Sequence, residues 1–465
     1  MESNAILIKN ANLITPICAN NGYWNDEIIN RKNVSVLIED DKISEIDSKI
    51  SENSVDKIIN AEGKILMPSL INTHTHSSMN LLRGVADDLE LDSWLNDHIW
   101  PMEAGLNGDL CYLGTQLAII EMIKTGTTCF SDMYFYMDSV AKAVDESGIR
   151  AVLSNGMIDF GDANKRESEF KDSIQLIKNL NNSANGRIKV YFGPHSPITA
   201  SKELLLGVRE YAEKYNTGIH IHMNETQKEI EDIQNQYNMR PFEYLNDIGF
   251  LDGIRNDDNG NDNGNNNENI NVLAAHCVWL SDREIAILKE NNVKVSHNPC
   301  SNMKLASGIA PVNKLIDNNV CVSLGTDGVA SNNNLDLFEE MKFASLLSKV
   351  NTLNPKVLPA NDLIKMTTLN AARALALDKE IGSIEIGKKA DMILMDTNNI
   401  SFTPTANSLI SHIVYSANGY SVDTTICDGN VLMENKQLKV FNEEEILNNA
   451  NKATLKLKNA IENKD

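Results

Sequence analysis

The stretch that decides the fold is IKVYFGPHSPITASKELLLGVREYAEKYNTGIHIHM (188–223). Its two ends, IKVYFG (188–193) and GIHIHM (218–223), are short apolar runs typical of buried strands, and residues 200–214 between them have the spacing of an amphipathic helix. A strand, a helix and a second strand in this order are the repeating unit of a parallel sheet. This stretch therefore predicts an α/β fold.

Strand-like runs of this kind recur through the middle of the chain. Eight can be counted: ILMPSLI (65–71), TTCFSD (127–132), RAVLSN (150–155), IKVYFG (188–193), GIHIHM (218–223), NVLAAH (271–276), VKVSHN (293–298) and VCVSLGTD (320–327). Amphipathic helices are predicted at 108–125, 136–147, 200–214 and 335–349, with a further one at 361–376. Eight alternating units predict a (β/α)8 TIM barrel.

Polar residues gather at or just beyond the C-terminal ends of these runs. In a barrel of this type the βα loops converge at that rim, which is where such enzymes carry out their chemistry. The residues are His74, His76, Asp132, Asn155, His195, His222, His276, His297 and Asp327.

The two ends of the chain have a different pattern. Residues 1–65 and 379–440 consist of short strand-like runs broken by turns, and we predict that they build one small β-sandwich beside a barrel of residues 66–378. Residues 441–465 are predicted as a C-terminal helix. The asparagine-rich segment RNDDNGNDNGNNNENIN (255–271) has too few apolar residues to order itself, so we expect a mobile loop on the N-terminal face, without a catalytic role.

Composition excludes several classes of function. The seven cysteines are scattered, odd in number and never form a C-x-x-C pair, which favours reduced thiols and argues against disulfides or thiolate metal sites. A formal charge of −22 disfavours nucleic acid and favours a neutral or cationic small molecule, although charge for solubility alone explains it equally well. The start, MESNAILIKNANLITP, has no basic region followed by an apolar run, and no stretch has the roughly 18 apolar residues of a membrane span. We expect a cytoplasmic protein without a membrane partner.

A metal site is predicted from polar residues at the ends of three strands. His74 and His76 in NTHTH are two residues apart on an extended run, so both imidazoles project to the same side and can share one cation. An isolated H-x-H pair is a weak signal, but His222 and Asp327 end two other strands of the same predicted barrel. Three imidazoles and a carboxylate suit zinc or iron better than magnesium or calcium, and of the two we favour zinc.

Two further residues are candidates for proton transfer. Glu225 lies three residues past His222, close enough to pass a proton to a substrate nitrogen beside the metal. His276 ends the next strand and is placed to hydrogen-bond an attacking hydroxide or a developing oxyanion. Taken singly, each has a simpler explanation, as a solvated loop glutamate and as a core histidine. Their common position on one rim favours catalysis.

At this point the sequence resembles a known family. The segments MPSLINTHTHSSMNLLRG, HIHMNET, LAAHCVWL, SHNPCSNMKLASGIAPV, LGTDGVASNNNLDLFEEM and GSIEIGKKADMILMD are similar to the S-adenosylhomocysteine, 5′-methylthioadenosine and 5′-deoxyadenosine deaminases of the amidohydrolase superfamily. The resemblance spans nearly the whole chain. It implies a distorted (β/α)8 barrel with a β-sandwich from both termini and a site for one metal ion, since strand four ends at His195 in GPHS rather than at the lysine of binuclear relatives.

The resemblance also assigns roles to individual residues. His74, His76, His222 and Asp327 match the metal ligands, and Glu225 and His276 match the proton shuttle and the hydroxide-orienting histidine. Glu103, in WPMEAGL, matches the carboxylate that holds the ribose hydroxyls, and it is the main indication of a nucleoside substrate. Further substrate contacts are implied for His195, Trp94 and Arg166; at Asn155 some relatives carry an arginine instead.

The activity implied is metal-dependent deamination of 5′-substituted adenosines, namely 5′-deoxyadenosine, 5′-methylthioadenosine, S-adenosylhomocysteine and adenosine, to the inosine analogue and ammonia. In the expected mechanism a metal-activated water gives its proton to Asp327, Glu225 protonates N1 of the purine, and His276 stabilises the new oxygen at C6. The alternatives are a guanine deaminase or an s-triazine chlorohydrolase, which share the metal site but do not need Glu103. A cytidine-deaminase type is disfavoured because PCSNM has no second cysteine. The resemblance also implies a homo-oligomer such as a tetramer.

Overall fold

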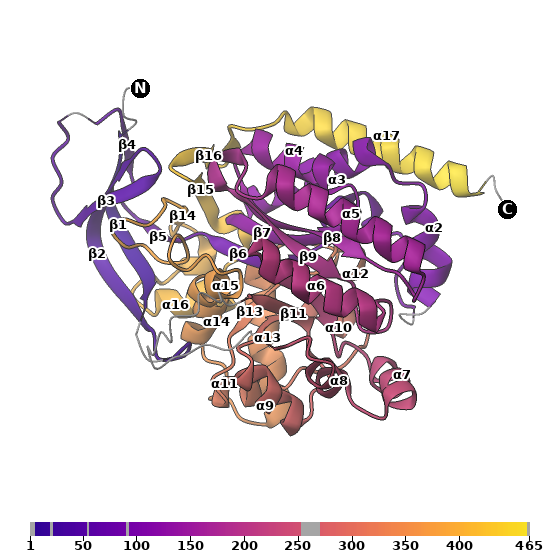
Figure 1. Cartoon of the computed structure of the whole chain (residues 1–465). Coiled ribbons are helices and arrows are strands. Elements are labelled where there is room, and N and C mark those ends of the chain that lie inside the picture. The colour runs from indigo at the N-terminus through magenta and orange to yellow at the C-terminus, as the bar shows by residue number, and fades with distance from the viewer. Residues whose placement is uncertain (1–4, 19–21, 54, 90–92, 253–269, 463–465) are drawn as a thin grey trace.

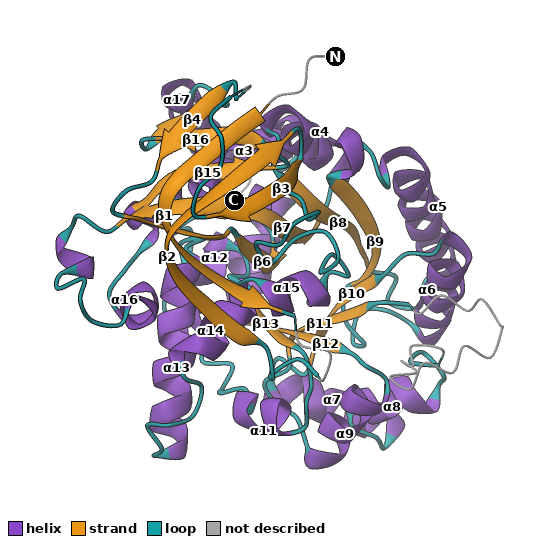
Figure 2. Ribbon diagram, turned by 90° about the vertical axis from the view of Figure 1, so that its left-hand side faces the viewer, coloured by secondary structure: helices purple, strands orange, loops and turns teal. Residues whose placement is uncertain are grey.

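The computed structural model describes residues 5–18, 22–53, 55–89, 93–252 and 270–462. Eight parallel strands form one sheet in the order β13-β12-β11-β10-β9-β8-β7-β6, which curls into a barrel surrounded by helices (Figures 1 and 2). The strands are β6 Leu70–Thr75, β7 Thr127–Tyr134, β8 Arg150–Met157, β9 Ile188–Pro194, β10 Ile219–Met223, β11 Val272–His276, β12 Lys294–His297 and β13 Val322–Leu324. The barrel predicted from the eight runs is confirmed.

Burial explains why these runs become strands. Every residue of β6, β7, β10, β11, β12 and β13 is buried, as expected for parallel strands that face side chains of the barrel interior on one side and helices on the other. Such strands are continuously apolar except where a polar residue has a function or a partner. The polar residues at their C-terminal ends are therefore exceptions that need an explanation.

Side chains close the barrel between its last and first strands. The amide of Asn72 in β6 donates to Oγ1 of Thr326 at 2.7 Å, and the backbone N–H of Thr326 donates back to Oδ1 of Asn72 at 3.0 Å. One residue further on, the N–H of Asp327 donates to the carbonyl of His74 at 2.9 Å. The seam between β13 and β6 therefore ends at two of the predicted metal ligands.

Helices cover the outside of the barrel. Those that precede β10 are α2 Trp100–Glu103, α3 Gly108–Lys124, α4 Met137–Ser147, α5 Ala163–Leu180 and α6 Lys202–Tyr215. Those that follow it are α7 Gln227–Tyr237, α8 Pro241–Asp247, α9 Asp282–Glu290, α10 Pro299–Lys304, α11 Val312–Asp317, α12 Val329–Asn332, α13 Leu337–Thr352, α14 Ala360–Thr367 and α15 Leu369–Ala374. The single helix predicted at 361–376 is two short helices, because Thr368 has φ −127° and ψ −95°, outside the helical region.

The terminal segments share a second sheet of nine strands. Its order is β17-β16-β15-β14-β5-β1-β2-β3, with β4 paired to β1. The strands are β1 Ala5–Ile17, β2 Glu27–Glu39, β3 Lys42–Asp47, β4 Lys57–Asn60, β5 Lys64–Pro68, β14 Met392–Asp396, β15 Val422–Cys427, β16 Asn430–Glu434 and β17 Gln437–Leu438. The added β unit built from both termini is confirmed.

One predicted strand is divided between the two sheets. Residues 65–71 were expected to form one barrel strand, but β5 ends at Pro68 in the terminal sheet and β6 starts at Leu70 in the barrel. Pro68 has no N–H to donate to a ladder, and the N–H of Leu70 bonds the carbonyl of Gly126 at the foot of β7. Periodicity alone does not show this change of sheet.

The remaining elements complete the outer layer. α16 Leu409–Tyr415 lies between β14 and β15 in the chain, and α17 Glu443–Glu462 runs across the outside of α3 (Figure 1). The hydroxyl of Thr454 in α17 donates to the carbonyl of Leu81 at 2.9 Å. Among the described residues no helix is long and apolar enough to cross a membrane. Most of the asparagine-rich segment, residues 255–269, lies outside the described residues.

A buried ionic cluster joins the barrel to the terminal sheet. Arg150 starts β8, and its guanidinium donates to Asp391 at 3.1 Å and to Asp428 at 3.1 Å. The side chains of Arg150 and Asp391 are 2% and 1% exposed. A charge buried to this degree is tolerated only while its partners remain.

Replacing Asp391 should therefore destabilise the whole protein. We expect Asp391→Asn to lower the free energy of unfolding by about 3–5 kcal/mol, because the Arg150 charge loses the buried carboxylate that accepts two of its hydrogen bonds. The exposed pair of Lys314 and Asp282 is the control, and Lys314→Gln should cost about 1 kcal/mol or less. Urea unfolding followed by circular dichroism measures both. Equal effects of the two substitutions would contradict the structural role of the cluster.

Candidate active site

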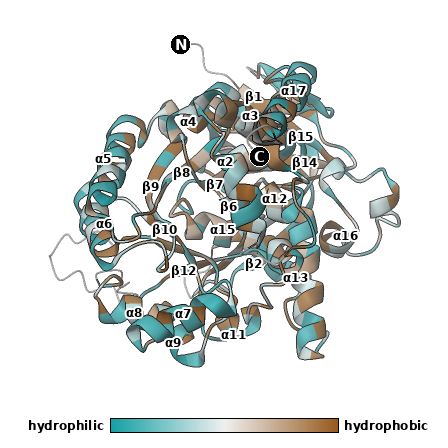
Figure 3. Cartoon of the chain, turned by 90° about the vertical axis from the view of Figure 1, so that its right-hand side faces the viewer, coloured by the Kyte–Doolittle hydropathy of each residue, from teal (hydrophilic) through white to brown (hydrophobic). Residues whose placement is uncertain are grey.

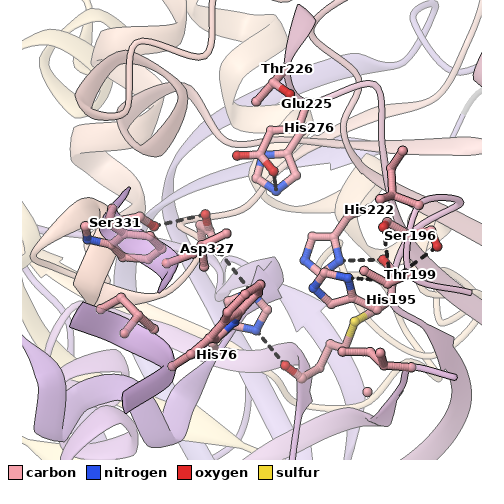
Figure 4. Close-up of a pocket in the computed structure, with 18 of the residues that line it drawn as sticks. His76, His195, Ser196, Thr199, His222, Glu225, Thr226, His276, Asp327 and Ser331 are labelled. Atoms are coloured by element: carbon pink, nitrogen blue, oxygen red, sulfur yellow. Dashed lines mark hydrogen bonds and ion pairs between the residues drawn. The ribbon is translucent and has the colours of Figure 1, made fainter. Parts of the chain in front are cut away.

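Three histidines and an aspartate converge at the C-terminal rim of the barrel, and Figure 4 shows His76, His222 and Asp327 among them. His74 lies in β6, His76 directly follows it, His222 lies in β10, and Asp327 follows β13. Ligand nitrogens of the three histidines lie within 4.8 Å of one another. The Nε2 atoms of His74 and His76 are 3.4 and 3.2 Å from Oδ1 of Asp327. The structure therefore brings the four predicted ligands around one point.

Each of the three imidazoles is oriented through its other nitrogen. A hydrogen bond at Nδ1 fixes the ring and leaves Nε2 for a ligand, as in the outer shells of metal sites. The partners are Nε2 of His220 for His74 (2.9 Å), the carbonyl of Met133 for His76 (2.5 Å) and the carbonyl of His195 for His222 (2.8 Å). Nε2 of His74 is buried and has no hydrogen-bond partner among the described residues. A cation at the common point would satisfy it.

Charge at this point also favours a cation. Burial opposes ionisation of Asp327, but its interactions with the nearby His74 and His76 outweigh burial and hold the pKa of Asp327 well below its usual range. For His76, burial disfavours the charged ring, yet Asp327 more than compensates and raises its pKa to about 9. The carboxylate therefore stabilises positive charge among the imidazoles. Three imidazoles and one carboxylate fit a divalent ion such as zinc.

The backbone is strained at Asp327 and at His276, the last residue of β11. Asp327 has φ 63° and His276 has φ 71°, a region that residues with a Cβ rarely occupy. Asp327 is held there by its N–H bond to His74 and by two hydroxyls that donate to its Oδ2, Ser301 at 2.6 Å and Ser331 at 3.0 Å. Such strain is typical of functional positions, where the surrounding structure compensates its cost.

Glu225 and His276 lie beside the metal ligands and face each other (Figure 4). Oε2 of Glu225 is 3.8 Å from Nε2 of His276, and Nδ1 of His276 is 3.0 Å from Oδ1 of Asn302. Burial raises the pKa of Glu225, which favours a carboxyl group that carries a proton closer to neutral pH. The pair can donate a proton and stabilise an oxygen at neighbouring positions.

Glu229 is a site residue that sequence reasoning missed. Its carboxylate accepts the backbone N–H of Asn224 at 2.9 Å and that of Glu225 at 2.8 Å, so it fixes the loop that carries Glu225. Burial raises its pKa to about 7 against the opposing effect of these two bonds. A glutamate in the first turn of α7, four residues past Glu225, was an available signal, because such glutamates often bond the N–H groups before a helix.

A cavity of about 300 Å³ opens beside these groups and is lined by residues from several loops. Glu103 is on its wall, where one carboxylate oxygen accepts the hydroxyl of Tyr134 at 2.6 Å. Burial raises the pKa of Glu103. Trp94 also lines the cavity, and its indole N–H is buried without a partner among the described residues.

His195 lines the same cavity and is neutral at physiological pH. Burial, together with the nearby His76 and His276, lowers its pKa to about 4. Nδ1 of His195 lies 3.0 Å from the hydroxyl of Thr199. A neutral ring held in this way can exchange one hydrogen bond with a bound molecule through Nε2.

Arg166 does not reach this cavity, contrary to the role expected for it. Its guanidinium donates to Asp159 at 3.1 Å and to Ser201 at 3.2 Å, and it is absent from the lining residues. The Asp159 carboxylate already pairs with this charge, so Arg166 supports the start of α6 instead. Asp132, another rim residue, accepts the N–H of Ser77 at 2.7 Å and shapes the loop after β6.

The sequence and the fold of this chain are similar to those of known amidohydrolases. Residues 65–432 match the model of the amidohydrolase family. The 5′-deoxyadenosine deaminase of Methanobrevibacter smithii is 58% identical over 462 residues, 99% of this chain and 100% of that protein. The crystal structure of an adenosine deaminase from Xanthomonas campestris with bound zinc superposes with a TM-score of 0.87 at 30% identity and covers 98% of both chains. An atrazine chlorohydrolase from Arthrobacter aurescens, complexed with zinc, shares the fold at 21% identity and a TM-score of 0.85, over 97% of this chain and 100% of its own.

Replacing one of the two carboxylate oxygens of Glu229 by an NH2 group tests whether this residue holds Glu225 in place. In Glu229→Gln one backbone N–H faces an NH2 group, so a buried donor loses its acceptor at a cost of about 1–3 kcal/mol. We expect kcat to fall about 10–100-fold while bound zinc per chain stays unchanged, because no ligand is altered. The matched control is Glu231→Gln, an exposed residue of the same helix. Equal kcat values in the two variants, or loss of zinc from Glu229→Gln, would contradict a positioning role.

Proposed function

This chain belongs to the amidohydrolase family, and we propose that it deaminates adenosines with a small 5′ substituent, 5′-deoxyadenosine first among them. Support comes from the relative named 5′-deoxyadenosine deaminase, which matches 99% of this chain, and from the zinc-containing adenosine deaminase with the same fold. The reaction adds water at C6 of the purine and releases ammonia and the inosine analogue. We further propose that the metal is zinc.

The single observation that carries the nucleoside assignment is the position of Glu103. Its carboxylate is half-buried in the wall of the cavity that Glu225 and His276 also line, and one of its oxygens is oriented by Tyr134. A buried carboxylate is costly unless a ligand or a partner bonds it. Two vicinal hydroxyls of a ribose can each donate such a bond to one carboxylate, whereas guanine and the s-triazines have no vicinal hydroxyls. Glu103 therefore favours a nucleoside over the alternative substrates.

Each side chain at the site has a separate role in the proposed reaction. His74, His76, His222 and Asp327 would hold the metal, which when bound lowers the pKa of a water molecule toward about 7 and makes it a nucleophile. The carboxylate of Asp327 accepts a proton from the attacking water. Glu225 gives a proton to N1 of the purine, which neutralises the charge that builds on the ring as C6 is attacked.

Two histidines complete the proposed reaction. His276, held by Asn302 through Nδ1, forms a hydrogen bond through Nε2 with the oxygen that forms at C6. His195 is neutral, so it hydrogen-bonds the substrate without adding charge to a cavity that already holds a cation site. Transfer of the proton from Asp327 to the amino group lets ammonia leave, while the hydroxyl at C6 returns its proton to the carboxylate of Glu225 and becomes the carbonyl of the product.

Glu103→Gln tests the nucleoside assignment directly. The variant keeps the size of the side chain but loses the negative charge, so two bonds to ribose hydroxyls weaken by about 1.5–3 kcal/mol in total. We expect KM for 5′-deoxyadenosine to rise about 10–100-fold with little change in kcat, measured by ammonia release. Glu167→Gln, at an exposed position of α5, should leave both constants unchanged.

A substrate panel accompanies this comparison. Wild-type protein is given 5′-deoxyadenosine, 5′-methylthioadenosine, S-adenosylhomocysteine, adenosine and guanine in parallel, with Glu225→Ala as the inactive control. Activity on the adenosines that depends on Glu225 is the expected result. Turnover of guanine alone, or a KM for 5′-deoxyadenosine that Glu103→Gln leaves unchanged, would overturn the nucleoside assignment.

A further inference from the structure

Glu340 is a buried acidic residue that the proposed reaction does not use. It lies in the first turn of α13, is 0% exposed, and is absent from the residues that line the catalytic cavity. Among the described residues its hydrogen-bond donors are Cys300 and Asn332, and neither of them is a cation. Burying a carboxylate without a cation is costly, so we expect the bonds that it forms to serve a purpose.

The two oxygens of Glu340 bond two different short helices. Oε2 accepts the backbone N–H of Cys300 in α10 at 3.2 Å, and Oε1 accepts the side-chain amide of Asn332 in α12 at 2.6 Å. The same amide group donates to the carbonyl of Thr326, directly before Asp327, at 2.7 Å. α10 contacts both α12 and α13, and Figure 3 shows α12 and α13 on the same side of the barrel. Glu340 therefore joins α10, α12 and the segment after β13.

These two short helices hold groups of the active site. Ser301 of α10 donates to Oδ2 of Asp327 at 2.6 Å, and Ser331 of α12 donates to the same oxygen at 3.0 Å (Figure 4). Asn302 of α10 orients His276 through Nδ1 at 3.0 Å. Each residue that the buried glutamate bonds is thus one or two positions away from a residue that orients Asp327 or His276.

We propose that Glu340 is a positioning residue for the deamination. Because one carboxylate bonds both short helices, it fixes their separation, and the hydroxyls of Ser301 and Ser331 then converge on Asp327. Through α10 the same bonds also set the ring of His276. Glu340 acts through these residues and does not line the cavity itself. The inference rests on the roles proposed above for Asp327 and His276.

Glu340→Gln tests this role. The variant keeps the size of the side chain but has one acceptor oxygen instead of two, so its NH2 group faces an N–H donor of α10 or α12. We expect kcat for 5′-deoxyadenosine to fall about 10–100-fold, because both Asp327 and His276 lose their orientation. KM should stay unchanged, since Glu103 and His195 belong to the segments that follow β6 and β9.

Zinc affinity gives a second readout, which does not depend on the substrate. In Glu340→Gln the three imidazoles keep their partners but Asp327 is held less firmly, so the dissociation constant for zinc should rise about 10-fold. Competition with a chromophoric chelator measures this constant. Glu339→Gln, at the exposed neighbouring position of α13, is the matched control and should keep the kcat, KM and zinc affinity of the wild type.

Two further variants separate positioning from a general loss of stability. Asp391→Asn removes a buried carboxylate where the two sheets join, so it should lose stability but keep the wild-type kcat and zinc affinity. Asn332→Ala removes the other half of the link to α12 and should lower kcat as well. The double variant of Glu340 and Asn332 should lose less than the product of the two single effects, because both act on the same bond. Circular dichroism checks that each variant is folded.

Several results would overturn the proposal. Glu340→Gln with the wild-type kcat and zinc affinity would contradict it, and so would losses that Asp391→Asn reproduces or single effects of Glu340 and Asn332 that multiply in full. If Glu340→Gln does not fold, the same two readouts on Asn332→Ala decide. A wild type that deaminates none of the adenosines would overturn the proposed function instead, and the zinc affinities of Glu340→Gln and Glu339→Gln would then decide on Glu340.

Discussion

The contact of Asp327 with His74 and His76, at the C-terminal end of β6, is the interaction on which the rest of the structure depends. It lies at the seam where the last barrel strand meets the first, and the N–H of Asp327 bonds the carbonyl of His74 there. The same residue that closes the barrel thus supplies the carboxylate that stabilises positive charge among the imidazoles. Closure of the fold and assembly of the metal ligands are one event, because neither β6 nor β13 alone brings a carboxylate and an imidazole together.

Around this seam the working groups come from different loops and are held by residues that do not take part in chemistry. Asn302 orients His276, Ser301 holds Asp327, and Glu229 fixes the backbone of Glu225. Substitutions can therefore change one of these groups at a time: the proposed metal ligands, the proton donor or the proposed ribose-binding carboxylate. This explains how one fold accommodates both an adenosine deaminase and a chlorohydrolase among the solved structures.

Sequence patterns predicted the parts of the structure that follow from local chemistry. The eight strands were recognisable because buried parallel strands are continuously apolar, and the histidines stood out because polar residues end those runs. Three-dimensional partners were not predictable in this way: Glu229 bonds two N–H groups that any residues could supply. Arg166 was assigned by resemblance, but a loose alignment cannot show that Asp159 already pairs with it. The change of sheet at Pro68 likewise depends on what lies beside that residue.

The central claim is that one metal ion, held by His74, His76, His222 and Asp327, drives deamination of 5′-deoxyadenosine. The most direct measurement titrates zinc into metal-stripped protein and follows ammonia release and bound zinc per chain together. The account predicts that activity is absent without metal, rises in proportion to bound zinc and saturates at one ion per chain. Deamination that persists without metal, or a rate that saturates only at two ions per chain, would contradict it.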